Sequence, residues 1–397
     1  MTEADITCPA LRDRDDRKSA SIADTAAKPM PGYAPVARYN LASDILRSPS
    51  IRQGMDGGDY FGETDPGRIP VIFLDGDIHK KRRSQIARYF TPKAIKDRHS
   101  RVMEDTTAEL MADLRRSGRG QLDVMSLRLA SDVAAEIVGL TTSEASAMSE
   151  RLRRLFRSSN RKKLAGLRGR LGSIENVLRT LHFHHRDVVP AIRHRQKHDE
   201  DDVISYLVRE GFSDREILVE CMTYATAGMI TTREFIVMVA WQLLGDDTLR
   251  AQFLEGGEAV QFAILDEILR IDPVAAYIYR RAEEDMVAED GTQVNAGEMF
   301  RIDIRTANLD ESATGECPFA IDPERAKRQR MPSNWLSFGD GPHRCPGAQV
   351  AMHETRIFID SLLRVPGIRL AKPPTLGWLE EINGYELHGA IVTCDRG

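Results

Sequence analysis

The sequence predicts a mainly α-helical protein with small β-sheets. Helical periodicity dominates residues 79–193, with breaks near residues 118–120, 141–143 and 166–172. Residues 213–245 are apolar on most helical faces, which is typical of a central buried helix. The strand patterns are short in comparison, as at residues 277–279, 286–287 and 300–304. Long helices with short strands indicate an α class with minor sheet.

The first 73 residues predict a tail, a strand, a helix and a loop. Residues 1–30 are polar with few large apolar groups, so we expect a flexible N-terminal tail before a single domain over residues 31–397. Residues 35–40 are a short strand candidate, and a helix through Ile45 and Leu46 follows. Residues 50–73 are rich in Gly and Asp, which favours a loop.

The central helix has clear start and stop signals. Ser213 and Glu216 have capping-box spacing, and Gly245 is a helix-ending glycine. About 32 residues at about 1.5 Å each predict a rod of about 48 Å. A second helix over residues 258–270 is expected to stop before Pro273.

The last 88 residues mix irregular and regular structure. We expect an irregular stretch over residues 310–337, a helix over residues 348–365 and one terminal strand over residues 385–394.

Composition places the chain among ordinary globular proteins. It has 397 residues, 42% of them hydrophobic and 29% charged, with a net charge of −5, so nothing favours nucleic-acid binding. No run of about 18 apolar residues predicts a membrane span. The N-terminus lacks the apolar core of a signal peptide, and the five scattered cysteines suggest no disulfide framework. We therefore expect a reduced, cytoplasmic protein.

One cysteine, Cys345, lies among glycines and prolines in the stretch SFGDGPHRCPG. Glycines precede Cys345, and Pro346 and Gly347 follow it, which places the thiol at a helix N-terminus. The positive end of a helix dipole stabilises a thiolate. A zinc site needs about four ligands, and only His343 is near. A nucleophile needs a base, which nothing nearby clearly supplies. A haem ligand is the third kind of group that a cysteine in this setting could be.

At these residues the chain resembles the cytochrome P450 family, soluble bacterial type. Phe338, Gly341, Cys345 and Gly347 match its haem-binding loop, F-x-x-G-x-x-x-C-x-G. Four further motifs follow the family's pattern, namely E-x-x-R at Glu267 and Arg270, the oxygen-binding helix motif at Ala227, Gly228 and Thr231, H-x-x-x-R at His79 and Arg83, and R-x-A-x-E-D from Arg280. The resemblance covers about residues 35–397. It implies the cytochrome P450 fold, with an N-terminal sheet that is shortened here.

The resemblance implies haem b bound through the Cys345 thiolate. Phe338, Gly339, Gly347 and Ala227 would contact the haem. Four basic side chains would bind the two propionates through charge-assisted hydrogen bonds, namely His79, Arg83, Arg280 and His343.

In the family, the E-x-x-R pair supports the haem loop together with a third arginine. Glu267 and Arg270 lie at i, i+3 on one helix face. Arg325 fits the third position by its local sequence, and Arg330 fits it by its distance to Phe338. The sequence leaves the two open.

The resemblance assigns oxygen binding and proton delivery to Gly228, Thr231 and Thr232. Relatives commonly carry an acid immediately before the threonine, where this chain has Ile230. We therefore expect protons to arrive through water held by Thr231 and Thr232. The retained Thr231 favours monooxygenation over a peroxide-driven or atypical coupling reaction. The apolar helix around it favours an enzyme over a non-catalytic haem protein that binds a ligand.

The expected substrate is a small apolar organic molecule. Pocket segments implied by analogy include Phe61, Ile72, Phe73, Tyr224, residues 165–180, residues 274–279 and residues 383–387. Residues 151–197 carry 14 Lys and Arg against Glu175 and Asp187, which suggests solvated faces or else an acidic substrate or carrier protein. We expect the histidines among residues 182–185 to lie on the surface rather than to bind a metal ion.

Electrons would reach the haem from NAD(P)H through a separate ferredoxin and ferredoxin reductase. No flavin or ferredoxin module fits beside a haem domain of this length. Arg344, His353 and Arg356 would form the surface that meets an acidic ferredoxin.

Overall fold

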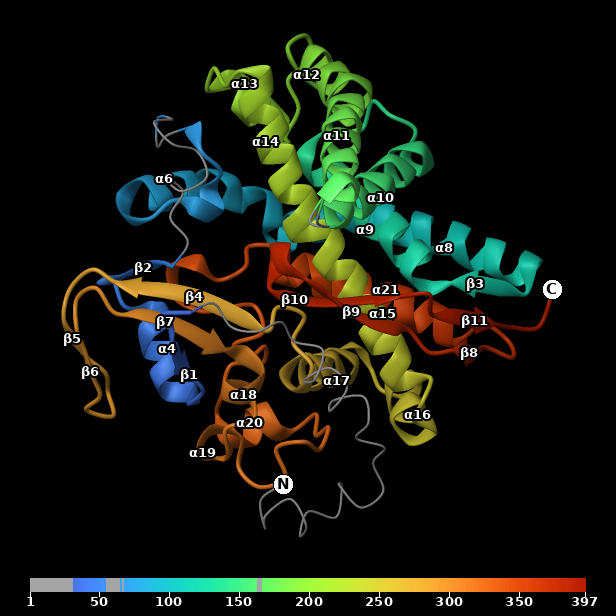
Figure 1. Ribbon diagram of the computed structural model, residues 1–397. Helices are drawn as coiled ribbons and strands as arrows, with labels where there is room; N and C mark the ends of the chain where they lie inside the picture. Colours follow the sequence, from blue (N-terminus) through green and yellow to red (C-terminus); the bar gives the residue numbers. More distant parts are fainter. Residues whose placement is uncertain (1–30, 55–64, 66–67, 163–165) are drawn as a thin grey trace.

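The computed structural model describes residues 31–54, 65, 68–162 and 166–397, so the predicted tail of residues 1–30 lies outside the described part. Within it, helices make up most of the structure and four small sheets lie around them (Figure 1). The predicted fold class is confirmed. No helix in these residues combines the length and apolar character needed to cross a membrane.

The central helix consists of three consecutive segments. They are α14 (Asp214–Tyr224), the π-helical η6 (Ala225–Ile230) and α15 (Thr231–Leu243). Ser213 and Glu216 form the predicted capping box. The π-helical turn was not predicted. The Thr231 hydroxyl donates to the Ala227 carbonyl at 2.6 Å, which competes with the regular backbone bonding at this turn.

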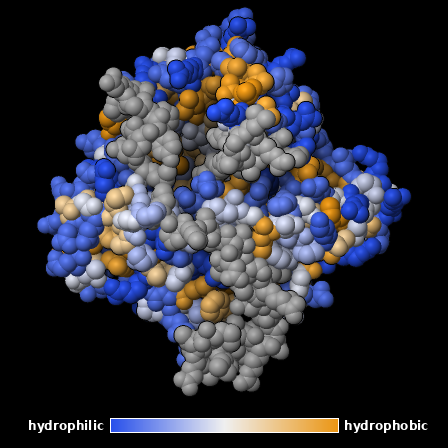
Figure 2. Space-filling model, in the orientation of Figure 1, coloured by the Kyte–Doolittle hydropathy of each residue, from blue (hydrophilic) through white to orange (hydrophobic). Residues whose placement is uncertain are grey.

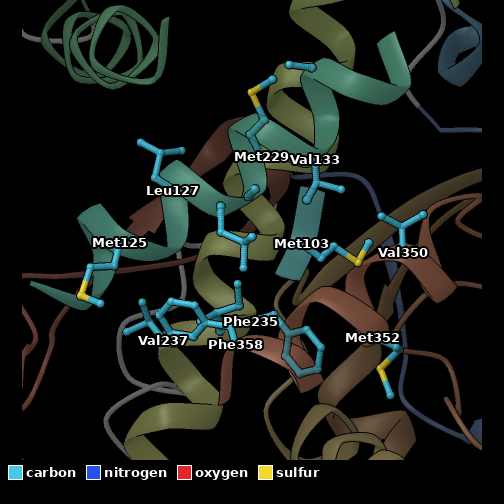
Figure 3. Close-up of a cluster of buried hydrophobic side chains, with 14 of the residues drawn as sticks. Met103, Met125, Leu127, Val133, Met229, Phe235, Val237, Val350, Met352 and Phe358 are labelled. Atoms are coloured by element: carbon cyan, nitrogen blue, oxygen red, sulfur yellow. The ribbon is translucent and has the colours of Figure 1, made fainter. Parts of the chain in front are cut away.

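Four helices build the core with the central helix. They are α8 (Ser100–Ser117), α9 (Leu122–Val138), α17 (Glu258–Ile271) and α21 (Ala348–Leu363). Three of them are in contact with the central helix, while α8 packs against α9 and α21. Figure 3 shows Met229 of η6 near Val133 of α9, and Phe235 of α15 near Phe358 of α21. These side chains are buried, and the hydrophobic effect at this contact fixes α21 against α15.

The other α-helices lie outside this group. They are α4 (Tyr39–Arg47), α6 (Gly76–Ala87), α7 (Pro92–Ala94), α10 (Ala145–Lys162), α11 (Gly166–Phe183), α12 (Val189–Arg195), α13 (Val203–Arg209), α16 (Asp247–Glu255), α18 (Ile304–Asn308), α19 (Glu311–Thr314) and α20 (Arg325–Gln329). The breaks predicted near residues 118–120 and 141–143 are confirmed. The break predicted over residues 166–172 is wrong, because α11 already begins at Gly166.

Short 3-10 and π-helical turns lie between the helices and strands. They are η2 (Val71–Phe73), η3 (Arg88–Phe90), η4 (Ile95–His99), η5 (His184–Val188), η7 (Gly341–His343) and η8 (Glu380–Ile382). The stretch 310–337 was predicted to be irregular, but it contains the short helices α19 and α20.

The largest sheet has the strand order β1-β7-β4-β2. Its strands are β1 (Ala34–Val36), β7 (Met299–Asp303), β4 (Tyr277–Ala282) and β2 (Ile51–Gln53). β1 pairs parallel with β7, and the other pairs are antiparallel. Only three residues of β1 precede α4, in line with a short N-terminal sheet.

Three smaller sheets complete the described strands. β5 (Met286–Val287) pairs with β6 (Gln293–Val294), and β9 (Thr375–Leu379) pairs with β10 (Gly384–His388). β11 (Ile391–Thr393) lies between β3 (Arg119–Gln121) and β8 (Arg369–Lys372). The single terminal strand predicted over residues 385–394 is therefore wrong. Gly389 has φ +73°, a left-handed conformation that redirects the chain from one sheet to the next.

Candidate haem-thiolate site

The loop before α21 is a tightly turned segment. The Cys345 amide donates to the Phe338 carbonyl at 2.8 Å, and the Gly339 amide donates to the Leu336 carbonyl at 2.8 Å. Gly339 and Gly341 have φ of +69° and +64°. A Cβ on Gly341 would lie 2.3 Å from the Leu46 carbonyl oxygen, so only glycine allows this approach to α4.

Helix α4 holds the same loop through Asp340. The Asp340 carboxylate accepts from Ser43 Oγ at 3.0 Å and from Arg47 Nε at 2.8 Å. It also accepts the amide of Gly341 at 2.7 Å, which begins η7. The N-terminal region therefore fixes the loop that carries the cysteine.

The Cys345 sulfur lies beside the start of α21, as the sequence predicted. Burial raises the pKa of the Cys345 thiol. The backbone amide of Gly347, the charges of Arg83 and Arg344 and the amide of Ala348 act in the opposite direction. Both amides belong to the helix N-terminus, so the local backbone is arranged for a thiolate.

Three of the four predicted propionate-binding residues form one cluster. The rings of His79 and His343 stack at 4.0 Å between centroids. His343 contacts Asp75 through Nε2 at 2.9 Å and Gln53 through Nδ1 at 3.0 Å. The Arg280 guanidinium donates to Gln53 Oε1 at 2.5 Å. Gln53 and Asp75 are members of this cluster that the sequence reasoning missed.

The fourth residue, Arg83, lies one turn from His79 on α6 and donates to the Arg344 carbonyl. Its guanidinium thus contacts the backbone immediately before Cys345.

Burial perturbs the charged states of this cluster. Burial, followed by the nearby His343 and Arg83, lowers the pKa of His79 to about 4. Burial also lowers the pKa of Arg280 to about 10. Arg280 donates only to uncharged oxygens of Gln53 and the Tyr279 backbone among its described hydrogen bonds. A buried cation with neutral partners fits an anionic group such as a propionate.

The E-x-x-R pair sits in a fully buried network. Arg270 donates to Glu267 through Nε at 2.7 Å and through its terminal nitrogen at 2.8 Å. Arg325 donates to the same carboxylate at 3.1 Å and to carbonyls of the preceding loop. Arg330 instead ends α20 in a left-handed conformation and is exposed. Of the two arginines, Arg325 is the one that contacts Glu267.

The middle of the central helix has an open face. Ala227 is exposed although it lies mid-helix, and a Cβ built on Gly228 would meet no atom within 4 Å. Thr231 lies one turn beyond Ala227 on this face. A flat ligand fits against such a surface. The open Gly228, the amide-flanked Cys345 and the buried Arg280 are together compatible with haem.

The residue before Thr231 is apolar and lies inside the protein. Ile230 is buried. Glu234, the next acid along the helix, accepts from Arg233 Nε at 2.7 Å and from the Leu387 amide at 2.6 Å. Its carboxylate therefore ties α15 to β10.

A second acid, Glu354 of α21, was missed by the sequence reasoning. It is buried, contacts the Thr232 hydroxyl, and its Oε2 is without a hydrogen-bond partner in the described residues. Burial raises the pKa of Glu354 to about 8 against the weaker effect of Thr232. The available signal was one acid between Val350 and Phe358 on the apolar face of a helix.

The segments expected to line a substrate pocket meet in part. Ala275 forms a bridge with Gly384, and the Tyr385 amide donates to the Val274 carbonyl at 3.3 Å. The Tyr224 ring stacks with Phe90 at 6.4 Å. Ile72 is exposed and Phe73 half-buried, while Phe61 lies outside the described residues.

Comparisons with known proteins agree with this geometry. The family model for Cytochrome P450 matches residues 262–365. Cytochrome P450(MEG) of Priestia megaterium is 25% identical over 335 residues, covering 82% of this chain and 77% of that protein. The Steroid C26-monooxygenase of Mycolicibacterium smegmatis is 26% identical over 350 residues, covering 86% of this chain and 82% of its own.

A solved structure shows the same fold. P450BioI, in a complex with acyl carrier protein ligated to hexadec-9Z-enoic acid, superposes with a TM-score of 0.74 and 22% identity. The match covers 95% of this chain and 97% of that one. The family-model match, the sequence relatives and the cysteine loop lead to one conclusion: the chain belongs to the cytochrome P450 family of haem monooxygenases.

Proposed function

We propose that the chain binds haem b through Cys345 and inserts one atom of O2 into an apolar organic substrate. The observation that supports this most directly is the Cys345 sulfur beside the Gly347 and Ala348 amides. In this proposal Arg83, Arg280, His79 and His343 hold the propionates. When bound, haem with a thiolate ligand supplies the chemistry that cleaves the O–O bond.

The protein's own part in the reaction is to position groups and to deliver protons. Thr231 presents its hydroxyl on the open face of the central helix, beside Gly228. Since Ile230 replaces the usual acid, we assign the proton store to Glu354, which holds a proton near neutral pH and contacts Thr232. Water bound by Thr231 and Thr232 would complete the route.

Electrons are proposed to come from NAD(P)H through a ferredoxin and its reductase. Arg344 and Arg356 lie on the side of the molecule that carries the cysteine loop and α21. Arg344 is exposed and donates to Asn334 at 2.9 Å, and the Arg356 guanidinium lies 5.6 Å from the Phe262 ring. His353 contacts the same ring. The charges of Arg344 and Arg356 favour an acidic electron donor.

The proposed substrate is apolar and is presented either free or on an acidic carrier protein. One relative is named for a steroid and one structural neighbour binds an acyl carrier protein. The basic composition of residues 151–197 favours the carrier-bound form.

The proposed haem ligation is tested by the absorbance of the reduced, CO-bound protein. The unmodified chain should give the Soret band of thiolate-ligated haem, and Cys345→His should give that of imidazole-ligated haem. An imidazole-type band in the unmodified chain would disprove ligation by Cys345.

A further inference from the structure

Helix α11 has an apolar stripe on its exposed surface. Leu171, Ile174, Val177, Leu178 and Leu181 are 58%, 58%, 57%, 61% and 46% exposed. They make up most of the exposed large hydrophobic side chains in the described part of the chain. Residues 171, 174, 178 and 181 follow the 3-4-3 spacing of a helix–helix contact seam. The seam is about 16 Å long, from 11 residues at about 1.5 Å each.

The opposite face of α11 is already used inside the protein. The helix packs mainly against α10 and η5. Figure 2 shows apolar side chains gathered on the surface where Figure 1 places α11. An exposed apolar patch on a soluble surface marks an interaction site.

Arginines flank the stripe at both ends, and the one acid of α11 is paired with an arginine. Arg170 lies at the N-terminal end of the stripe, and His185 and Arg186 lie at its C-terminal end, all exposed. Glu175, the acid of α11, accepts from Arg179 at 2.9 Å. Asp187 is buried and pairs with Arg151. The side chains of Arg157, Arg161, Lys162, Lys163 and Arg168 lie outside the described residues.

We propose that this stripe binds a helix of a substrate carrier protein, and that this helix has an apolar edge with acidic residues beside it. The inference rests on the proposed function and specifies its partner. A helix is the shape that 3-4-3 spacing accepts, and acidic flanks would complement Arg170 and Arg186.

The size of the stripe favours such a partner over a second copy of this chain. A stable dimer buries about 800 Å² on each partner, which is more than five side chains on three helical turns provide. In a contact between two copies, Arg170 and Arg186 of one chain would also lie near the same arginines of the other, and these like charges would repel each other. A transient carrier complex needs less area, and opposite charge speeds its formation.

The test measures binding of a holo acyl carrier protein to the haem-loaded full chain by biolayer interferometry. Leu178→Glu should weaken binding by about tenfold or more, because it puts a carboxylate in the seam. Val287→Glu is the matched control, since Val287 is also 61% exposed but lies on the β5–β6 hairpin. It should bind the carrier like the unmodified chain. Raising salt from about 50 to about 300 mM should weaken binding.

Three results would overturn the proposal. One is that the Leu178→Glu variant binds the carrier as well as the Val287→Glu variant does. Another is a dimer by light scattering that Leu178→Glu abolishes, with no carrier binding. The third is flotation with vesicles of phosphatidylglycerol, again without carrier binding. The reduced-CO spectrum of the same preparations separates these outcomes from a failure of the proposed function, which would alter the spectrum of the unmodified chain.

Discussion

At the scale of single residues, two glycines of the cysteine loop have the same backbone conformation but different surroundings. Gly341 is pressed against the Leu46 carbonyl, whereas a Cβ on Gly339 would find its nearest atom at 3.8 Å. Both substitutions to alanine incur left-handed strain of about 1–2 kcal/mol. Gly341→Ala must also push α4 away.

Gly341→Ala should therefore lose haem while Gly339→Ala retains most of it. Haem content is measured as the ratio of Soret to protein absorbance in purified protein. Equal loss in both variants would show that strain, and not the contact with α4, limits the loop.

Glu354 makes stability depend on pH. Its pKa is raised from 4.5 to about 8, so the folded state keeps a proton that the unfolded state releases. Its contribution is fully present below about pH 4.5 and is lost as pH rises through about 8. In Glu354→Gln the loss in the free energy of unfolding between acid and alkaline pH should be smaller by at least about 1 kcal/mol, as measured by urea unfolding across this pH range. Glu104→Gln, an exposed change on α8, should keep the original slope.

The two arginines that the sequence left open differ sharply in environment. Arg325 is buried against Glu267, and Arg330 is exposed. Arg325→Ala leaves a carboxylate short of one partner and should cost about 3–5 kcal/mol in the free energy of unfolding. Arg330→Ala should change it by less than about 0.5 kcal/mol. Similar losses in chemical denaturation would contradict this assignment.

At the scale of elements, the Thr231 hydroxyl accompanies the π-helical turn η6. Thr231→Ala removes the bond to the Ala227 carbonyl and one holder of the proposed proton-carrying water. We expect a larger share of consumed oxygen to leave as peroxide, measured against product. Thr223→Ala is the control, because Thr223 makes the same kind of bond, to Val219, within regular helix. Unchanged coupling in Thr231→Ala would remove this threonine from the proton route.

The elements show where sequence reasoning succeeds. The central helix was predicted because its capping box and apolar length are local signals. The π-helical turn in this helix was not predicted, since it depends on the hydrogen bond from the Thr231 hydroxyl to the Ala227 carbonyl. The predicted terminal strand is divided at Gly389 because its first half pairs with β9 and its second half pairs with β3. Local periodicity does not show with which distant strand a segment pairs.

At the scale of the whole molecule, the family motifs point to the candidate site residues but not to all the partners that these residues have in the structure. The motifs themselves contain Cys345, His79, Arg280 and Thr231, so these residues could be proposed from the sequence. Gln53, Asp75 and Glu354 were missed, since each matters only through a contact made far along the chain. Gln53, for example, meets His343 across 290 positions.

The attachment of α4 to the cysteine loop predicts long-range coupling. Asp340→Asn weakens the bonds to Ser43 and Arg47. We expect faster transfer of haem to excess apomyoglobin, by about threefold or more, because hydrogen bonds to a charged group contribute about 1.5–3 kcal/mol. Asp44→Asn, one position along the same helix, should transfer haem at the original rate. Equal rates in all three proteins would rule out α4 as a support of the loop.

That attachment also dictates an order of events during synthesis. Ser43 and Asp340 are separated by 297 positions, and β1 at the start of the described chain pairs with β7 near residue 300. An N-terminal segment emerging from the ribosome has neither partner yet. The loop that carries Cys345 therefore gains its contacts with α4 only after residue 340 has been translated, and haem would be held firmly only from that point on.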